Sequence, residues 1–222
     1  MKTDNVMRGL INKIIALLVQ IFGNIYTYRM NERLKNLYGT IYSLWVRRAL
    51  GSVGECTGFS WPLLLQGGGQ QRIQIGSHTH FGHHCVLGCW EKYVSSNGVE
   101  HFEPEIIIGN NCHFGEYSQI SAINKITIGD GLLTGRFVYI GDNAHGELSL
   151  EDAETPPIRR RLISKGEIII GRNVWIADKV SIFGGVTIGD NVIIGAGSIV
   201  SHDIPSNSVA VGAPVKIIKQ LK

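Results

Sequence analysis

A histidine three residues after an aspartate is the first group in this chain that could do chemistry. The segment GDNAHGE contains Asp142 and His145, and it lies where a long repetitive pattern stops. Histidine changes its protonation state near neutral pH, so its imidazole is well suited to take a proton from a hydroxyl group. Asp142 could orient that imidazole or cap a turn, and the sequence leaves both roles open. His145 is therefore a candidate for a general base, chosen for its position where the repeat stops.

The cysteines indicate neither a disulfide scaffold nor a metal site. There are four in 222 residues, too few for disulfide bonds to be the main stabilisation of a chain of this length. Cys85 and Cys89 are four residues apart, and no second pair with this spacing follows them, which argues against zinc. Because free cysteines are typical of reducing compartments, we expect a cytoplasmic protein.

The composition is that of a folded chain rich in turns. Hydrophobic residues make up 44% and charged residues 18%, which excludes a disordered polyelectrolyte. The 28 glycines are nearly twice the usual share of about 7%, whereas there are only 6 prolines. This balance favours a repetitive β architecture with many tight turns. The net charge of +3 is too small to indicate nucleic-acid binding.

From about residue 73 a large apolar residue, often followed by glycine, recurs every six positions. The positions form four runs: 75, 81 and 87; 108, 114, 120 and 126; 128, 134 and 140; and 170, 176, 182, 188, 194 and 200, with Thr134 the one polar residue among them. A period of six fits neither an α-helix nor simple strand alternation. It fits a coil of triangular cross-section, in which each hexad gives one short strand and one turn and the large residue points inward. Three hexads make a coil, so we expect about five coils whose stacking forms the core.

Two insertions interrupt the hexads, at residues 89–105 and 142–169. The second contains His145. Since the coils of such a stack are committed to packing, function is usually carried on insertions.

Residues 1–50 form a separate segment in which the pattern predicts two helices. Between Leu10 and Phe22 apolar residues recur at a spacing near 3.6, and a more polar helix is expected over residues 28–49. The segment has eight Lys or Arg residues and two acidic ones, a net charge of +6, while the remainder of the chain carries −3.

Two interpretations of this segment stay open. The helices could pack on the main domain, or the first could lie in the interface of an anionic membrane. The longest uncharged stretch, residues 14–28, is shorter than the ~18–20 residues that span a bilayer. No cleavage site of small residues follows it, so we do not expect a signal peptide.

Residues 171–219 closely resemble the C-terminal half of the hexapeptide-repeat acetyltransferases, especially the maltose/galactoside and polysaccharide O-acetyltransferase group. The resemblance extends over residues 73–219 and is most specific in IGDNVIIGAGSIV and VGAPVKIIK. It implies a mainly β fold: a left-handed parallel β-helix over residues 51–219, preceded by the helical segment and followed by a tail at 220–222. It also implies a homotrimer that transfers an acetyl group from acetyl-CoA to a sugar hydroxyl, without a metal.

The resemblance assigns roles to individual residues. His145 matches the base of the D-x-x-H motif of the family, and Asn124 lies where the family has an acceptor-contacting Asn, although it could be a turn residue instead. The positions that match the CoA side of the family are Trp175, Asp178, Ala196, Ser201, His202, Lys216 and Lys219. The two lysines match residues that pair with CoA phosphates. The chain departs from the family at residue 178, which is acidic, and at residue 202, where lysine is more usual.

Other functions stay open. Antibiotic acetyltransferases share the cofactor half of this pattern but not its acceptor half. Hexapeptide-repeat carbonic anhydrases bind zinc through three histidines, and the cluster here is incomplete because Ser118 follows His113 where a histidine is needed. A non-catalytic scaffold would not need His145. We expect a cytoplasmic O-acetyltransferase acting on a surface or capsular polysaccharide precursor, with peripheral membrane contact if residues 1–50 are interfacial.

Overall fold

The structure is a computed structural model that describes residues 2–147 and 149–221, and it divides into two units, Met1–Ile41 and Tyr42–Lys222. The predicted helices of the N-terminal segment are present as α1 (Lys2–Ile25) and α2 (Tyr28–Arg47). The hydroxyl of Thr27 accepts a hydrogen bond from the backbone N–H of Met30 at 3.3 Å, which caps the start of α2. No single described helix is long and apolar enough to cross a membrane; α1 and α2 together, as a bent pair, meet that test of length and composition.

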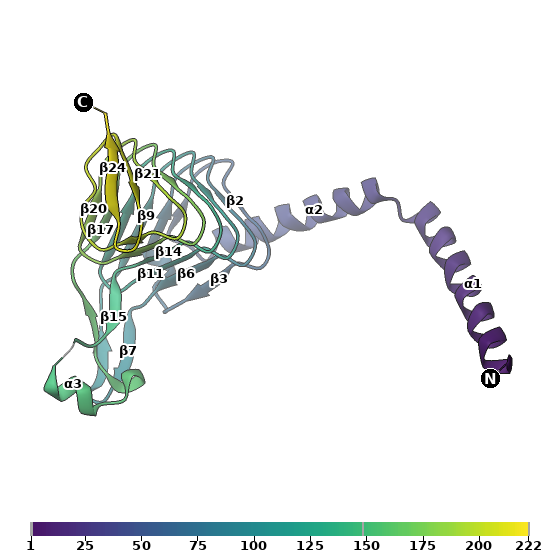
Figure 1. Ribbon diagram of the computed structural model, residues 1–222, viewed down its shortest axis with the longest axis horizontal. Coiled ribbons are helices and arrows are strands. Elements are labelled where there is room, and N and C mark those ends of the chain that lie inside the picture. Colours follow the sequence, from purple (N-terminus) through teal and green to yellow (C-terminus); the bar gives the residue numbers. More distant parts are fainter. Residues whose placement is uncertain (1, 148, 222) are drawn as a thin grey trace. The chain divides into compact units, whose positions relative to one another are not determined.

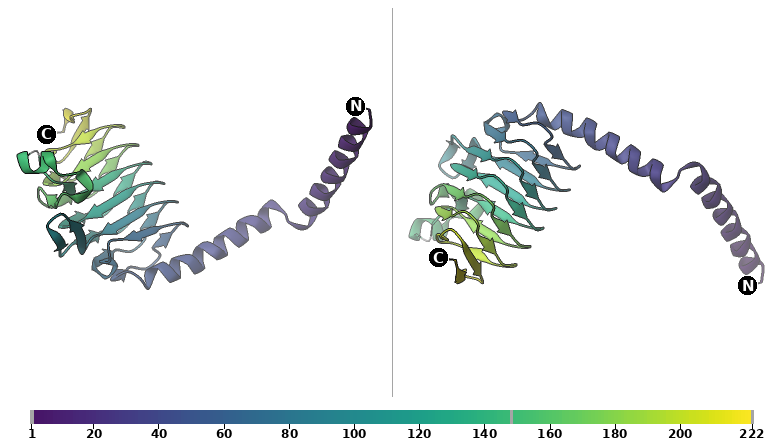
Figure 2. Two further views of the ribbon diagram at one scale, coloured as in Figure 1. Left: turned by 90° about the horizontal axis from the view of Figure 1, so that it is seen from below. Right: turned by 90° about the horizontal axis from the view of Figure 1, so that it is seen from above.

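The larger unit is a parallel β-helix built from three sheets, which we call faces 1, 2 and 3 (Figures 1 and 2). Face 1 consists of β1 (Ser52–Val53), β4 (Ile73–Ile75), β9 (Glu105–Ile108), β12 (Lys125–Ile128), β17 (Ile168–Ile170) and β20 (Val186–Ile188). Face 2 consists of β2 (Gly58–Phe59), β5 (His80–Phe81), β10 (His113–Phe114), β13 (Leu133–Thr134), β18 (Trp175–Ile176), β21 (Ile193–Ile194), β23 (Ser208–Val211) and β24 (Lys216–Gln220). Face 3 consists of β3 (Leu64–Gln66), β6 (Val86–Cys89), β11 (Gln119–Ala122), β14 (Tyr139–Gly141), β19 (Ser181–Phe183) and β22 (Ile199–Val200).

One strand from each face makes a coil, and the described residues form six coils rather than the five that the hexads predict. The additional coil lies before residue 73. Val53, Phe59 and Leu65 continue the six-residue count there, and each pairs with the inward residue of the next coil. Only Val53 is followed by glycine; Phe59 and Leu65 lack the apolar–glycine pair that marks most later hexads.

The inward residues stack in register along the whole β-helix. On face 3 the row runs through Leu87, Ile120, Ile140, Ile182 and Val200, which are 0–2% exposed. On face 2 the phenyl rings of the first three coils stack with centroids 5.3 and 4.5 Å apart. A single hexad could not bury its apolar side chain alone, so the predicted stacked core is confirmed.

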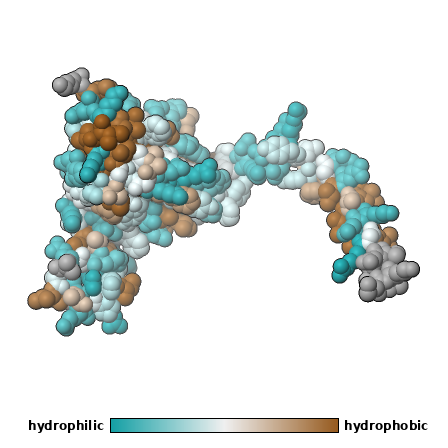
Figure 3. All heavy atoms as spheres, viewed as in Figure 1, coloured by the Kyte–Doolittle hydropathy of each residue, from teal (hydrophilic) through white to brown (hydrophobic). Residues whose placement is uncertain are grey.

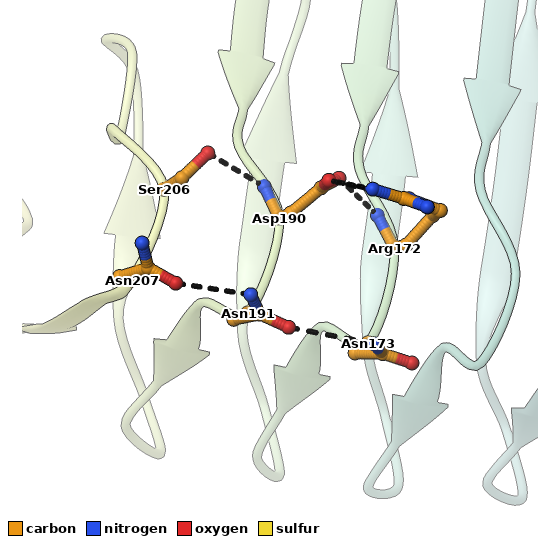
Figure 4. Close-up of polar contacts among 6 residues, drawn as sticks. All are labelled: Arg172, Asn173, Asp190, Asn191, Ser206 and Asn207. Carbon is orange, nitrogen blue, oxygen red and sulfur yellow. Dashed lines mark hydrogen bonds and ion pairs between the residues drawn. The ribbon is translucent and has the colours of Figure 1, made fainter.

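The corner between faces 1 and 2 is held by polar ladders (Figure 4). Asp190 accepts hydrogen bonds from the backbone N–H and the guanidinium of Arg172, both at 2.7 Å. Beside it the amides of Asn173, Asn191 and Asn207 bond to one another at 3.4 and 2.9 Å. These three asparagines have φ of 56–59°, the left-handed region in which asparagine is one of the few tolerated non-glycine residues.

Both ends of the stack are covered. At the first coil the guanidinium of Arg47, the last residue of α2, donates to the carbonyls of Val53 and Gly54 at 2.9 Å, and Val46 is fully buried. At the other end β24 turns back and pairs antiparallel with β23. Lys222, in the predicted tail, lies outside the described residues.

Both insertions leave the β-helix at the same corner, where face 3 gives way to face 1. Because the turns of successive coils stack there, we call it the insertion corner; it comprises residues 67–72, 90–104, 123–124, 142–167, 184–185 and 201–203. The first insertion is a hairpin of β7 (Lys92–Ser95) and β8 (Gly98–His101). The second contains β15 (Asn143–His145), α3 (Leu150–Glu154), the short 3-10 helix at Pro157–Arg159 and β16 (Leu162–Ser164). Figure 1 shows β7, β15 and α3 projecting together from this edge.

The asparagine ladder generates a stability prediction. Asn191→Ala and Asn191→Gly lose the same side-chain hydrogen bonds, but only alanine keeps a Cβ at a φ of 57°. That conformation costs a Cβ-bearing residue roughly 1–2 kcal/mol, whereas glycine loses about 0.5–1 kcal/mol through its freer unfolded chain. We expect urea unfolding to show the alanine variant less stable by about 0.5–1 kcal/mol. A glycine variant of equal or lower stability would mean that backbone conformation does not select asparagine here.

Candidate active site

The insertion corner brings together the predicted base, the predicted acceptor residue and part of the predicted cofactor side. Asn124 is an exposed turn residue between β11 and β12 in the third coil, and His145 belongs to the insertion of the fourth. Ser201 and His202 are exposed at the same corner in the sixth coil. Residues up to 78 positions apart are thus aligned along one edge because the coils stack in register.

Asp142 anchors the start of the second insertion. It is 2% exposed, and its two carboxylate oxygens accept the backbone N–H groups of Ile123 at 2.8 Å and Asn124 at 2.9 Å. Burial raises the pKa of the Asp142 carboxyl above its ordinary value, and these N–H groups partly oppose the rise. Of the two roles left open by the sequence, the structure shows the turn cap. Asp142 fixes the backbone that carries Asn124.

His145 is the last residue of β15, which forms an antiparallel ladder with β16. The ladder pairs Ala144 with Ile163 and His145 with Leu162, whose side chain is buried. Gly146 follows with φ of 77°, and a Cβ there would lie 2.6 Å from a carboxylate oxygen of Asp152. The imidazole therefore stands on a two-stranded arm at its junction with a tight turn, and it is exposed to solvent.

The two insertions contact each other through backbone and side chains. The backbone N–H of Ser96 donates to the carbonyl of Arg159 at 2.7 Å, and Arg161 lies 3.4 Å from a carboxylate oxygen of Glu100. Tyr93 reaches across from β7. Its hydroxyl donates to the carbonyl of Ile158 at 2.6 Å and lies 3.3 Å from Nδ1 of His145. The sequence did not identify Tyr93, because nothing in its local pattern distinguishes it from other residues of a polar hairpin.

A cavity of about 190 Å³ opens beside this arm. The residues that line it come from the fourth, fifth and sixth coils and from both strands of the arm: Gly141, Asp142, Asn143, Ala144, Ile163, Lys165, Phe183, Gly184 and Ser201. The Tyr139 ring lies over Gly141, in the space that a Cβ at residue 141 would fill. The cavity lies between the root of the arm that carries His145 and Ser201, one residue of the predicted cofactor side.

The other residues predicted for the cofactor lie elsewhere on this chain. Trp175 points outward from face 2, where it is 49% exposed. Asp178 and Ala196 are exposed at the corner between faces 2 and 3, and the Asp178 carboxylate caps the backbone N–H of Arg136 at 2.8 Å. Lys216 and Lys219 are exposed on β24. One chain therefore does not bring its predicted base and all of its predicted cofactor residues together.

The histidine cluster contains stacked rings, and the cysteines include a buried thiol. Among the described residues, no group of three or more His, Cys, Asp or Glu is placed to hold a metal ion. The rings of His80 and His113 stack at 5.3 Å, and burial, together with His113 and His83, lowers the pKa of His80. Cys89 ends β6 near the insertions, and burial raises the pKa of its thiol to about 12, so it is a thiol and a poor nucleophile at neutral pH.

Comparison with known proteins shows what this chain is similar to. The model of the bacterial transferase hexapeptide family (six repeats) matches residues 167–202. The putative lipopolysaccharide biosynthesis O-acetyl transferase WbbJ of Escherichia coli K12 is 36% identical over 119 residues, which are 52% of this chain and 60% of WbbJ. The galactoside O-acetyltransferase of the same strain is 39% identical over 132 residues, 54% of this chain and 60% of that enzyme. The chain thus spans less than two thirds of these relatives.

Among solved structures, AntD from Bacillus cereus, an N-acyltransferase in complex with dTDP and 3-hydroxybutyryl-CoA, is similar in fold with a TM-score of 0.63. It is 20% identical, and the similarity covers 82% of this chain and 88% of AntD. The left-handed parallel β-helix implied by the sequence resemblance is confirmed. The six-residue period and the stacked coils show that the chain contains hexapeptide repeats, and its sequence is similar to hexapeptide-repeat acetyltransferases.

Proposed function

We propose that the protein is an O-acetyltransferase that moves an acetyl group from acetyl-CoA to a sugar hydroxyl. The observation that carries the proposal is the position of His145, which is held by a strand ladder at the corner where Asn124, Ser201 and a cavity are also found. Two relatives that are named O-acetyltransferases support this reaction type. One of them is named for lipopolysaccharide biosynthesis, which favours a surface polysaccharide precursor as the acceptor.

The reaction needs one base and no covalent enzyme intermediate. His145 takes the proton of the sugar hydroxyl as the oxygen attacks the carbonyl carbon of the thioester. The C–O bond forms, the C–S bond breaks, and the imidazolium returns the proton to the sulfur, so the products are the acetyl ester and the CoA thiol. Asn124 lies on the backbone segment fixed by Asp142, and we assign it to the acceptor. The high pKa of Cys89 is consistent with direct transfer rather than an acyl-cysteine.

The residues assigned to CoA point to a homotrimer. The base lies at the insertion corner, whereas Trp175 lies on face 2 of the same chain, so a second copy is needed to bring the two groups together. Face 2 also exposes a row of apolar side chains, with Leu133 45% and Ile193 38% exposed on either side of Trp175. Lys216 and Lys219 suit the phosphates of CoA, because both are exposed cations. Packing of this row against a neighbouring copy would complete the site.

The base has a direct test. We expect His145→Ala to lower kcat in a thiol-release assay with acetyl-CoA by roughly 10²- to 10⁴-fold, the usual contribution of a general base. Binding of CoA, measured by calorimetry, should stay near the wild-type value because the imidazole acts on the acceptor.

His78→Asn is the matched control. It removes an imidazole at the corner between faces 1 and 2, where φ is 56° and asparagine is tolerated. If His145→Ala keeps most of its activity while the control behaves like wild type, the base must be another residue.

The assembly is tested by sedimentation equilibrium at micromolar concentration. We expect a mass three times that of the 24.4 kDa chain. Leu133→Glu should weaken the assembly because it places a charge in the apolar row of face 2, whereas Gln74→Glu adds the same charge on face 1 and should not. A wild-type monomer would contradict the shared site.

We propose further that α1 binds to an anionic membrane surface, where a lipid-linked acceptor would be located. The exposed apolar residues of α1 cover about 200° of its circumference at 3.6 residues per turn. They are Met7, Leu10, Ile11, Ile14, Ile15, Leu17, Leu18, Val19, Ile21 and Phe22, each 47–65% exposed. In Figure 3 the brown surface on α1 is formed by such side chains.

The width of this arc and the charge around it favour lipid over a coiled coil. A coiled-coil seam uses two positions in seven, so a seam through Ile14, Leu18 and Ile21 would leave residues at the edges of the arc, such as Leu17 and Val19, in water. Arg8 and Lys13 flank the apolar arc, and residues 1–50 have a net charge of +6. Basic groups near an anionic surface contribute about 1 kcal/mol each.

The membrane proposal is tested with two substitutions of equal charge. Leu18→Glu is central in the apolar arc and Gln20→Glu lies opposite it. Since burying a leucine contributes about 1.5–3 kcal/mol, we expect Leu18→Glu to weaken co-sedimentation with phosphatidylglycerol vesicles at least roughly tenfold, and Gln20→Glu to have little effect. Wild-type binding should decline with salt. Equal effects of the two variants, or no binding at low salt, would reject the proposal; a change in oligomeric state alone would indicate helix–helix packing.

A further inference from the structure

Tyr93 holds the candidate base from the other insertion. Its hydroxyl oxygen lies 3.3 Å from Nδ1 of His145 and 2.6 Å from the carbonyl oxygen of Ile158. The two rings meet edge to face with centroids 5.4 Å apart. Tyr93 and His145 are 52 residues apart in sequence, and each belongs to the insertion of a different coil.

The number of protons in this arrangement determines the direction of each hydrogen bond. A phenol has one proton, and a carbonyl oxygen can only accept. The short bond to Ile158 therefore uses the Tyr93 proton, and the phenolic oxygen is left to accept from His145. For that bond to form, Nδ1 of His145 must carry the proton, so the lone pair of the neutral imidazole is on Nε2.

We propose that Tyr93 is a positioning residue that selects the Nδ1–H tautomer of His145 and presents Nε2 to the acceptor hydroxyl. This inference rests on the proposed function only for its catalytic consequence. When Nε2 takes the proton, Nδ1 keeps its own, and the bond to Tyr93 becomes a charge-assisted one. Tyr93 therefore supports both protonation states that the reaction requires.

The first insertion has the construction that such a role needs. The β7–β8 ladder pairs Tyr93 with Glu100, and Glu100 is tied by Ser95 at 2.6 Å and approached by Arg161 of the second insertion at 3.4 Å. The backbone bond from Ser96 to Arg159 joins the same two segments next to Ile158. Two contacts thus tie the hairpin to the second insertion next to Tyr93, and they hold the hydroxyl close to the arm that carries His145.

Asp142, the other group that could have oriented the imidazole, is committed elsewhere. Both of its oxygens accept backbone N–H groups, and a third bond comes from the Asn143 amide at 3.5 Å. The described contacts of Asp142 do not include the imidazole. A carboxylate commonly orients a catalytic histidine, and here a neutral phenol occupies that place.

The test is Tyr93→Phe, which keeps the ring and removes only the hydroxyl. In protein labelled with ¹⁵N in histidine, we expect wild-type His145, assigned by its loss in His145→Ala, to be the Nδ1–H tautomer at a pH where it is neutral. We expect Tyr93→Phe to show a mixture of both tautomers. Its kcat should fall by roughly 10- to 100-fold, the usual effect of losing a group that orients a functional histidine, with KM for acetyl-CoA unchanged.

Tyr117→Phe is the matched control, since it removes a hydroxyl from the corner between faces 2 and 3 and should change neither measurement. A wild-type Nε2–H tautomer, or a tautomer unchanged by Tyr93→Phe, would overturn the inference. The spectrum does not depend on turnover. A protein without transferase activity but with the expected tautomers would therefore reject the proposed function and retain the role of Tyr93.

Discussion

The structure depends on the stacking of inward side chains in register from coil to coil. The strands of the three faces are mostly two to four residues long, and they are too short to be stable without neighbours on both sides. Ile182, for example, is fully buried because its row continues through Ile140 on one side and Val200 on the other. A residue that leaves its row exposes two neighbours as well as itself. Any departure from the repeat must therefore occur at a corner, where the chain can leave and return without disturbing a row.

This constraint explains why the candidate chemistry lies outside the coils. The proposed general base is carried on an arm that leaves one corner after Gly141 and rejoins face 1 at Ile168. Three contacts determine its direction: the buried carboxylate of Asp142 at its root, the ladder between β15 and β16 along its length, and Tyr93 beside the imidazole. The coils form a rigid support for the arm, and the arm carries an imidazole that could not be accommodated among the inward-facing side chains of the repeat.

Most of the fold could be predicted from the sequence, whereas the contacts within the site could not. The six-residue period predicts stacked coils because each inward side chain repeats the environment of the last. The coil at Val53, Phe59 and Leu65 was missed because only one of its three hexads has the apolar–glycine pair, although the spacing is present. The helices near the N-terminus followed from their 3.6-residue pattern.

At the site, the position of His145 could be predicted because it falls where the period stops. The contact between His145 and Tyr93 could not, since it joins two insertions that have no period and meet only after the coils between them are in register. The capping role of Asp142 depends on two backbone N–H groups about 20 residues upstream, which no local pattern reports. The division of the cofactor candidates between face 2 and the insertion corner likewise follows from which way each strand faces, and motif matching alone does not show it.

The covered ends of the β-helix have a consequence for the size of the particle. Because each coil can pair with another coil on both sides, the repeat itself does not limit the number of coils in a stack. The strand edges of an uncovered last coil could pair in parallel with the first coil of a second molecule. Here β24 runs antiparallel on β23, so the edge of the largest sheet no longer matches the direction of a first coil. At the opposite end, Arg47 occupies the carbonyls of Val53 and Gly54 that an incoming strand would need. Both features oppose the end-to-end stacking of β-helices into a filament.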